Sequence, residues 1–250
     1  MALLWAQATA EGRIEVRSAG RTRRLYQDGV CHTQYHPGRA ATGSVWDLMW
    51  LPALLLPADA RRALMLGVGG GAVMRMWLRH TALDEIVGIE RSAVHLELAR
   101  RFFDLDDPRV TLHRADALAW LARAPAEPAF DLIVDDLFGA RDRTPERTIF
   151  FDRPWFERLC AHLTPHGLLV VNFDTAAALR GARQRLGPAL TKRFGAVLSL
   201  THPVCENRVA VFGPATLTAT AMREAVAARP ELAAAAATGE LRFNLRSLQP

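Results

Sequence analysis

The chain has 250 residues, of which 50% are apolar and 23% are charged. This length allows one large hydrophobic core, and a second full domain is not expected. The three cysteines are too few and too scattered for a disulfide framework or a paired-cysteine metal site. We therefore expect a protein of a reducing, cytoplasmic compartment with no metal centre.

The formal net charge of +5 comes almost entirely from arginine, because Lys192 is the single lysine. The arginines are spread along the chain without an RNA-binding aromatic motif or a cysteine–histidine finger, so no nucleic-acid partner is expected. The longest apolar run, from Leu48 to Leu56, is interrupted by Pro52 and is about half as long as a membrane span. No signal peptide and no membrane partner are expected.

Residues 11–35 contain short β-like pieces separated by turn signals, including Asp28-Gly29. The pieces are residues 13–17, 23–26 and 30–34. A helical stripe with Trp46 and Trp50 follows, which either packs in the core or forms a subunit contact, so a homodimer stays open. We predict a small N-terminal β-lobe with a connecting helix over residues 1–60.

From Arg62 onward, short apolar runs alternate with helical segments, a pattern typical of a parallel sheet covered on both faces. The predicted strands are residues 63–68, 85–90, 110–115, 131–135, 168–173, 196–201 and 208–212. The predicted helices are residues 72–80, 92–103, 117–123, 153–163 and 175–187, with Ser92, Asp116 and Asp152 as N-caps. The alanine-rich stretch 218–239 should also be helical, followed by a polar tail.

The last two predicted strands are joined only by residues 202–207, which is too short for a helical crossover. They should therefore form an antiparallel hairpin. This hairpin separates the expected fold from an ordinary dinucleotide-binding domain. We assign the whole of residues 61–250 to one α/β domain.

The sequence Gly67-Val68-Gly69-Gly70-Gly71 follows an apolar strand and opens a helix. Missing side chains let a ligand approach the backbone there and leave amide groups free to bind it. With Ala72 in the last glycine position, the loop also satisfies the dinucleotide pattern, so a nicotinamide enzyme stays open. A tight turn with no ligand is the other alternative.

Two acids end the next two strands of the predicted sheet. Glu90 follows Gly71 by 19 residues, which places its carboxylate at the carboxyl edge of the sheet, where it could accept both ribose hydroxyls. Asp116 could accept the adenine amino group while the amide of Ala117 contacts the ring. Asp116 could equally be a helix N-cap, and Glu90 a solvated surface residue.

Asp135 ends the fourth strand, which runs through Leu132-Ile133-Val134. We expect its carboxylate to project into the crevice where the reacting end of a nucleoside would lie. A partly desolvated acid in that place could orient or deprotonate a nucleophile, which makes Asp135 the candidate catalytic residue. Its alternative role is to order a loop.

The order of these motifs resembles the spermidine synthase-like (polyamine aminopropyltransferase-like) family of the class I S-adenosylmethionine-dependent methyltransferase superfamily. The likeness includes Leu78-Arg79-His80, Phe130 to Asp135 and the stretch 151–172, and Arg24 to Gly29 resembles the family's β-lobe. The resemblance implies a Rossmann-like, seven-stranded class I methyltransferase fold with an antiparallel terminal hairpin. It also implies S-adenosylmethionine or its decarboxylated form as the cofactor.

By this resemblance, Glu90 would bind ribose, Asp116 would bind adenine, and Asp135 would be the base that acts on an attacking amine. The loop around the nucleoside would consist of Gly67, Gly69, Gly70 and Gly71. The expected cofactor site is completed by Glu90, Asp116, Ala117 and Asp135. The acceptor would be a small molecule.

The departures from the family pattern concern its charged and polar positions. The family's aspartate that faces the aminopropyl ammonium falls on Gly70, its glutamine on His32, and its second acid on Phe138. Burying ammonium groups without carboxylate partners is costly, so spermidine synthesis from putrescine is not expected at an appreciable rate. Loop acids Asp136 and Asp142 could fold inward as substitutes.

These departures favour methyl transfer from S-adenosylmethionine to an unidentified small acceptor. The alternatives are aminopropyl transfer from the decarboxylated nucleoside, and a catalytically silent nucleoside-binding protein. His32 and His36 have helical i,i+4 spacing but lie in a β-like stretch, so they are not expected to bind a metal.

Overall fold

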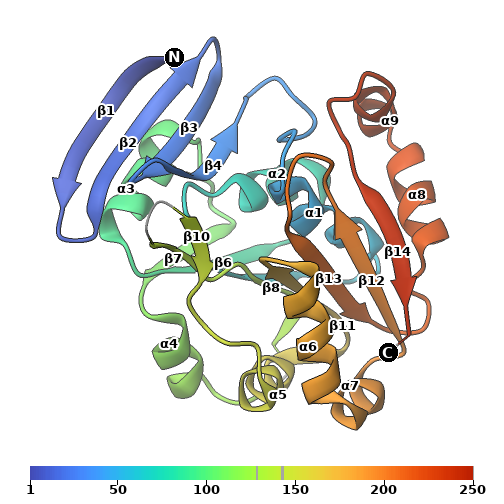
Figure 1. The fold of residues 1–250 in the computed structure, drawn as a ribbon. Coiled ribbons are helices and arrows are strands. Elements are labelled where there is room, and N and C mark those ends of the chain that lie inside the picture. The colour runs from blue at the N-terminus through green and yellow to red at the C-terminus, as the bar shows by residue number, and fades with distance from the viewer. Residues whose placement is uncertain (128, 142–143, 250) are drawn as a thin grey trace.

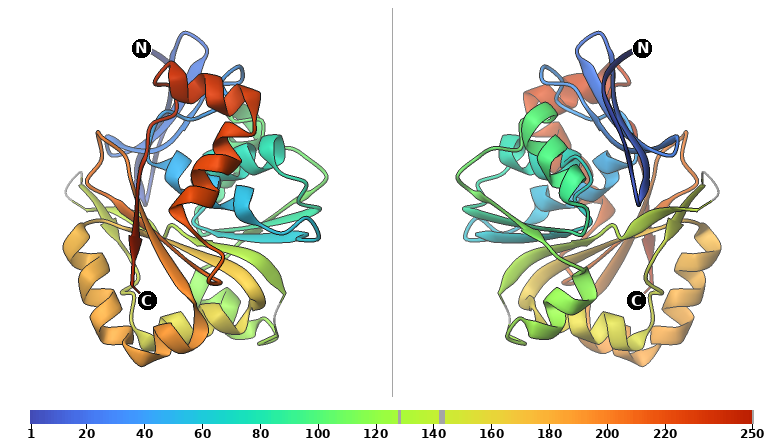
Figure 2. Two further views of the ribbon diagram at one scale, coloured as in Figure 1. Left: turned by 90° about the vertical axis from the view of Figure 1, so that its right-hand side faces the viewer. Right: turned by 90° about the vertical axis from the view of Figure 1, so that its left-hand side faces the viewer.

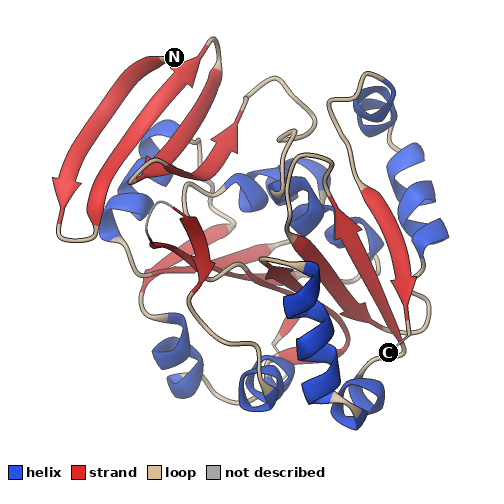
Figure 3. Ribbon diagram, in the orientation of Figure 1, coloured by secondary structure: helices blue, strands red, loops and turns tan. Residues whose placement is uncertain are grey.

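The computed structural model describes residues 1–127, 129–141 and 144–249 (Figure 1). Over this range it contains an N-terminal antiparallel sheet of four strands, a two-stranded hairpin, and a main sheet of eight strands. Helices cover both faces of the main sheet (Figure 3). The predicted α/β class, with a β-lobe ahead of a Rossmann-like sheet, is confirmed.

The N-terminal sheet is a simple meander of neighbouring strands. Its strands are β1 (Ala2–Thr9), β2 (Gly12–Ala19), β3 (Thr22–Gln27) and β4 (Val30–Tyr35). The predicted turn at Asp28-Gly29 joins β3 to β4 with φ values of 48° and 83°, as a two-residue hairpin turn requires. The sequence pattern missed β1, which has no buried position to mark it.

A short helical segment connects this lobe to the main sheet. Helix α1 (Trp46–Trp50) leads directly into the 3-10 helix η1 (Leu51–Leu55). Both Trp46 and Trp50 are buried, so the apolar stripe belongs to the core of this chain. The carboxylate of Asp47 accepts from the amides of Thr42 and Gly43, each at 2.8 Å, and from the Trp50 indole at 2.7 Å.

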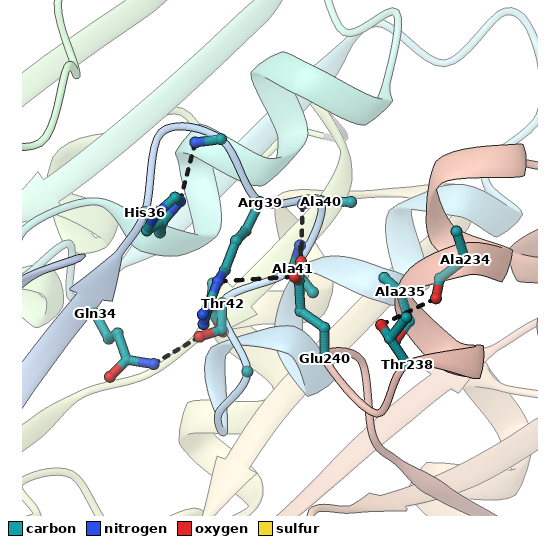
Figure 4. A network of polar contacts seen from close by, with 12 residues as sticks. Gln34, His36, Arg39, Ala40, Ala41, Thr42, Ala234, Ala235, Thr238 and Glu240 are labelled. Atoms are coloured by element: carbon teal, nitrogen blue, oxygen red, sulfur yellow. Dashed lines mark hydrogen bonds and ion pairs between the residues drawn. The ribbon is translucent and has the colours of Figure 1, made fainter. Parts of the chain in front are cut away.

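The segment before α1 is also tied to the C-terminal part of the chain (Figure 4). The carboxylate of Glu240 accepts from the amides of Ala40 and Ala41 at 3.1 and 3.3 Å. The Gln34 side chain donates to the carbonyl of Thr42 at 2.7 Å. Residues nearly 200 positions apart in sequence therefore fix the connection between the lobe and the sheet.

The main sheet has the strand order β14-β12-β13-β11-β8-β5-β6-β7. Its parallel strands are β5 (Arg62–Leu66), β6 (Glu85–Glu90), β7 (Val110–Arg114), β8 (Phe130–Asp135) and β11 (Leu163–Phe173). The other three strands are β12 (Ala196–Thr201), β13 (Arg208–Gly213) and β14 (Asn244–Leu248). The predicted β12–β13 hairpin is antiparallel, as expected.

The predicted seven strands fall one short of the main sheet in the described residues. The extra strand, β14, lies in the stretch taken for a polar tail and pairs antiparallel with β12. Its residues are exposed or half-buried and do not alternate regularly, so composition alone did not mark it. A strand can form there because β12 otherwise ends the sheet with unpaired backbone groups.

The helices form two layers on opposite faces of the sheet (Figure 2). One layer packs with the lobe and contains α1, η1, α2 (Ala72–His80), α3 (Ala93–Phe102), α8 (Ala219–Ala227) and α9 (Pro230–Ala237). The other contains α4 (Ala117–Arg123), α5 (Arg153–Ala161), α6 (Ala176–Leu186) and α7 (Pro188–Arg193). The predicted helix over 218–239 is divided because Pro230 begins a new helix.

The three predicted N-caps are confirmed. The side chains of Ser92, Asp116 and Asp152 accept from the amides of His95, Ala119 and Trp155, three residues further along the chain. Among the described residues, no helix is long and apolar enough to cross a membrane.

Alternation along the central strands assigns side chains to the two layers. In β8, Leu132 and Val134 belong to the core on the lobe side, whereas Ile133 belongs to the core beneath α4 to α7. In β11, Val170 lies on the lobe side and Val171 on the other. Successive residues of a strand point to opposite faces, so this pattern continues to the polar residues at the strand ends.

Candidate functional site

A cavity of about 970 Å³ lies at the carboxyl edge of the parallel strands. Its walls come from the lobe, the glycine loop, the end of β6, and the hairpin of β9 (Phe138–Arg141) and β10 (Thr144–Arg147). Figure 1 shows β10 in front of the main sheet on the side of the lobe. Ligands of open α/β sheets bind outside the carboxyl ends of the strands, so this cavity is the candidate site.

The glycine loop forms one wall of the cavity through Gly67, Val68 and Gly69. Gly67 and Gly69 have φ values of 85° and 55°. A Cβ on Gly67 would lie 2.3 Å from the carbonyl oxygen of Asp136, so the loop touches the end of β8 directly. Gly70 and Gly71, which were expected in the same site, lie outside the lining.

Gly70 is packed against the lobe. Its amide donates to Thr33 Oγ1 at 2.6 Å, and an added Cβ would lie 2.9 Å from Thr33 Cγ2. An acid at this position would therefore collide with β4 unless Thr33 moved. The absence of an acid at position 70 and the presence of Thr33 in β4 therefore depend on each other.

Glu90 lines the cavity at the end of β6, as predicted. Its Oε2 accepts from the amides of Val68 and Gly69 at 3.1 and 3.0 Å, and its Oε1 accepts from the amide of Ser92 at 2.9 Å. The carboxylate thus fixes the glycine loop. Its oxygens keep lone pairs with which to accept further hydrogen bonds.

Asp116 and Ala117 lie outside the residues that line the cavity. Asp116 is exposed at the N-terminus of α4, and Ala117 is buried below it. The structure therefore supports the N-cap role of Asp116. Adenine binding by these two residues stays a prediction.

The expectation that Asp135 projects into the crevice is wrong. Its side chain is fully buried on the face covered by α5, where Oδ2 accepts from Trp155 Nε1 at 2.8 Å and forms an ion pair with Arg147. Asp135 follows the same alternation as Ile133, two residues earlier. A shift of one residue along a strand moves a side chain to the other face.

The acid that does line the cavity at the end of β8 is Asp136. The Asn172 side-chain amide donates to Asp136 Oδ1 at 2.8 Å, and Asn207 Nδ2 donates to Asn172 Oδ1 at 3.1 Å. Burial, reinforced by the nearby carboxylates of Asp135 and Glu90, raises the pKa of Asp136 to about 6. Continuing the alternation of β8 by one residue would have identified Asp136 from the sequence.

Two histidines of the cavity wall were not assigned to the site from sequence. The rings of His32 and His95 lie 5.5 Å apart, and His95 Nδ1 is 4.0 Å from Glu90 Oε1. Burial lowers the pKa of both imidazoles to about 4, so they are neutral at physiological pH. No local pattern places residues 32 and 95 side by side, because the lobe and α3 meet only in the fold.

The described residues contain no group of three or more His, Cys, Asp or Glu side chains that could hold a metal ion. The position at which the family pattern has a second acid, Phe138, lines the cavity in β9. Asp142, the other loop acid considered as a substitute, lies outside the described residues.

The parallel sheet, its antiparallel end and the glycine loop define the class I methyltransferase fold. Human methyltransferase-like protein 13, in complex with SAH, shares this fold with a TM-score of 0.58 at 21% identity, over 74% of this chain and 90% of that one. The chain belongs to the spermine/spermidine synthase family, because the model of the spermine/spermidine synthase domain matches residues 47–177, more than half of its length.

Curated relatives resemble this chain over the same region. Spermidine synthase 2 of Datura stramonium is 32% identical over 124 residues, which are 48% of this chain and 38% of that protein. The polyamine aminopropyltransferase of Mycobacterium tuberculosis is 35% identical over 130 residues, 48% of this chain and 24% of that protein. The matched region thus spans less than two fifths of either relative.

Two solved structures extend the similarity of fold. A probable spermidine synthase from Corynebacterium glutamicum has a TM-score of 0.71 at 20% identity, over 91% of this chain and 88% of that one. A spermidine synthase in complex with the transition state analogue AdoDATO has a TM-score of 0.64 at 18% identity, over 84% and 73%. Both similarities cover a larger share of this chain than the family model does.

The comparisons confirm the expected family, and they do not support the expectation of methyl transfer. The preference for methyl transfer depended on the acids that are absent at Gly70 and Phe138, whereas another acid, Asp136, does line the cavity. The antiparallel β12–β13 hairpin also argues against a nicotinamide enzyme. A silent nucleoside-binding protein is disfavoured, because an acid does face the cavity.

Proposed function

We propose that the chain is a polyamine aminopropyltransferase-type enzyme, which transfers the aminopropyl group of decarboxylated S-adenosylmethionine to a small amine. The observation that carries this proposal is the placement of Asp136 in one cavity with the glycine loop and Glu90. Family membership supplies the reaction class. The cavity supplies a nucleoside-binding wall and, next to it, an acid with a raised pKa.

Glu90 and the glycine loop would hold the nucleoside. Glu90 has lone pairs available for ribose hydroxyls while it keeps the loop amides in place. The adenine would extend toward Asp116 and Ala117 at the start of α4. Residues 1–60 would serve as the cover of this site and residues 61–250 as its nucleoside-binding domain.

Asp136 would act as the base in the transfer step. The lone pair of the acceptor nitrogen attacks the propyl carbon next to the sulfonium, and the carbon–sulfur bond breaks. Its electron pair stays on sulfur, which leaves neutral methylthioadenosine, and the nitrogen loses a proton to Asp136. A carboxylate with a pKa near 6 is ionised at pH 7 yet is a better proton acceptor than an ordinary aspartate.

Several carboxylates face the volume in which a cationic acceptor would bind. Besides Asp136, the cavity is lined by Glu11 from the β1–β2 turn and Glu146 from β10. These acids come from elements other than the two family positions occupied by Gly70 and Phe138. They support a cationic amine as the acceptor.

A donor panel tests the proposal. Thermal unfolding is measured with decarboxylated S-adenosylmethionine, S-adenosylmethionine, methylthioadenosine and NAD, because a ligand that binds the native state raises Tm. We expect the decarboxylated donor and methylthioadenosine to raise Tm, and NAD to leave it unchanged. Turnover is then scored by product. Methylthioadenosine supports the proposal, whereas S-adenosylhomocysteine formed from S-adenosylmethionine would replace it with methyl transfer.

A further inference from the structure

A buried ion pair joins the wall of the cavity to the opposite face of the sheet: Arg147 is one of the residues that line the cavity, whereas Asp135 is buried on the face covered by α5. The Arg147 guanidinium contacts Asp135 Oδ2, with side-chain exposures of 8% and 0%. Trp155 Nε1 donates to the same oxygen at 2.8 Å. Charges buried to this degree persist only when they are paired, so these two side chains hold each other in place.

Arg147 also binds the backbone of β11. Its Nη1 donates to the carbonyl of Asn172 at 2.9 Å, and its guanidinium carbon lies 5.7 and 5.8 Å from the ring centroids of Phe151 and Phe173. Arg147 is the last residue of β10 and pairs with Phe138. One side chain therefore ties the β9–β10 hairpin to the end of the main sheet.

The same contacts lead to the acid of the cavity. Asn172 receives Arg147 on its carbonyl and donates its side-chain amide to Asp136. Asp136 is joined to Asp135 through the backbone. Arg147 thus reaches Asp136 by two routes, one through Asn172 and one through Asp135.

We propose that Arg147 and Asp135 are a positioning pair, which fixes both the orientation and the charge state of Asp136 through Asn172 and the end of β8. This inference rests on the proposed function for its catalytic consequence, but its electrostatic part does not. If the pair only stabilised the fold, changing it would leave the pKa of Asp136 unchanged.

The two partners act on Asp136 with opposite signs. The Asp135 carboxylate raises the pKa of Asp136, and the Arg147 guanidinium lowers it. Other ionisable groups also face Asp136 or line the same cavity: Glu11, Glu90, Glu146, Arg24, Arg91, His32, His95, Tyr26, Cys31 and Cys205. Those groups stay unchanged when the pair is altered. The direction in which the pKa of Asp136 shifts is therefore caused by the change in the pair.

The test is the pKa of Asp136 in the free protein, measured by carbon NMR of labelled aspartate side chains. The resonance is assigned by its loss in Asp136→Asn. Arg147→Gln should raise this pKa and Asp135→Asn should lower it, each by about 1 unit, as for the loss of one nearby charge. The double variant Asp135→Asn/Arg147→Gln should return close to the parental value.

Arg153→Gln is the matched control, because Arg153 forms an exposed pair with Glu157 on α5. It should leave the pKa of Asp136 unchanged. The inference is overturned if both single changes leave that pKa unmoved or shift it in the same direction. If one single variant does not fold, the other decides: its pKa of Asp136 should differ in the stated direction from that of Arg147→Lys, which keeps the charge, and equal values overturn the inference.

Turnover separates this inference from the proposed function. If the enzyme transfers aminopropyl groups, Arg147→Gln should lower kcat more than it changes KM for the nucleoside, and should move the acid limb of the pH profile upward. If no variant turns over but the opposite pKa shifts appear, the pair acts as inferred and the proposed function fails. If turnover occurs and the pKa does not shift, the proposed function stands and the inference falls.

Discussion

Asp135 and Asp136 are adjacent in the chain, yet their carboxylates lie on opposite faces of the main sheet. Asp135 is buried against Trp155 and Arg147, whereas Asp136 lines the cavity and binds Asn172. This separation follows from the alternation of β8. It gives the two acids different roles, one in holding the structure and one in the proposed chemistry.

The first prediction contrasts the stabilities of the two amide variants. Asp135→Asn leaves the Arg147 guanidinium buried without a carboxylate, which should cost about 3–5 kcal/mol of unfolding free energy. Asp136→Asn should cost little at pH 8, since it removes a charge that the fold disfavours. Urea unfolding of both variants checks this, and equal losses would contradict the separation of roles.

The raised pKa of Asp136 also predicts how the stability of the fold depends on pH. The folded-state pKa of Asp136, about 6, lies above the ordinary value of 3.8, so the folded state binds this proton more tightly than the unfolded state. The contribution is fully present below pH 3.8 and is lost as pH rises through about 6. The stability of Asp136→Asn relative to the parent should therefore increase over this window, and a constant difference would contradict it.

The second prediction concerns the pH dependence of activity. Asp136 can accept a proton only as a carboxylate, so kcat/KM should rise with pH through about 6 and then level off until the acceptor amine titrates. Rates measured between pH 4.5 and 8.5 check this. An acid limb centred near pH 4, or none, would exclude Asp136 as the base.

The third prediction restores an acid to the glycine loop. Gly70→Asp should lower the unfolding free energy by about 1–3 kcal/mol, because its Cβ meets Thr33 Cγ2 at 2.9 Å. Adding Thr33→Ser should recover part of this loss and keep the hydroxyl that binds the residue 70 amide.

In that double variant, the affinity for decarboxylated S-adenosylmethionine should rise by about tenfold, since a charge-assisted hydrogen bond contributes about 1.5–3 kcal/mol. Methylthioadenosine, which lacks the ammonium, is the control ligand and should bind as before. Calorimetry that finds both ligands unchanged would show that residue 70 does not face the ammonium.

The fourth prediction concerns Glu90. Glu90→Gln places an NH₂ group against amide donors that now bind a carboxylate, so it should weaken methylthioadenosine binding by about 1.5–3 kcal/mol. Glu97→Gln, on the exposed side of α3, is the matched control. Unchanged affinity in Glu90→Gln would remove the ribose assignment.

Local patterns predicted the scaffold of the site well. The apolar runs with helices between them gave the parallel strands, and the short 202–207 connection gave the antiparallel hairpin. The glycine loop and Glu90 follow from strand ends, which meet at one edge of a parallel sheet. Each of these features is encoded within a few residues.

Features that depend on distant contacts were not predicted. Strand β14 forms because β12 offers an edge, and Arg147 is buried because Asp135, Phe151 and Phe173 converge on it. The misassignment of Asp135 has a different cause: the strand end was located correctly, but the facing residue was not read from the alternation. The neutral pair of His32 and His95 required the lobe to be placed against α3.

The most direct test of the account is the release of methylthioadenosine from decarboxylated S-adenosylmethionine in the presence of putrescine, cadaverine, agmatine or spermidine. The account predicts release with at least one amine by the parental protein, and a loss of about 10²–10⁴-fold in kcat for Asp136→Asn, with nucleoside binding retained. Absence of release from folded protein that binds the nucleoside, or full turnover by Asp136→Asn, would contradict it.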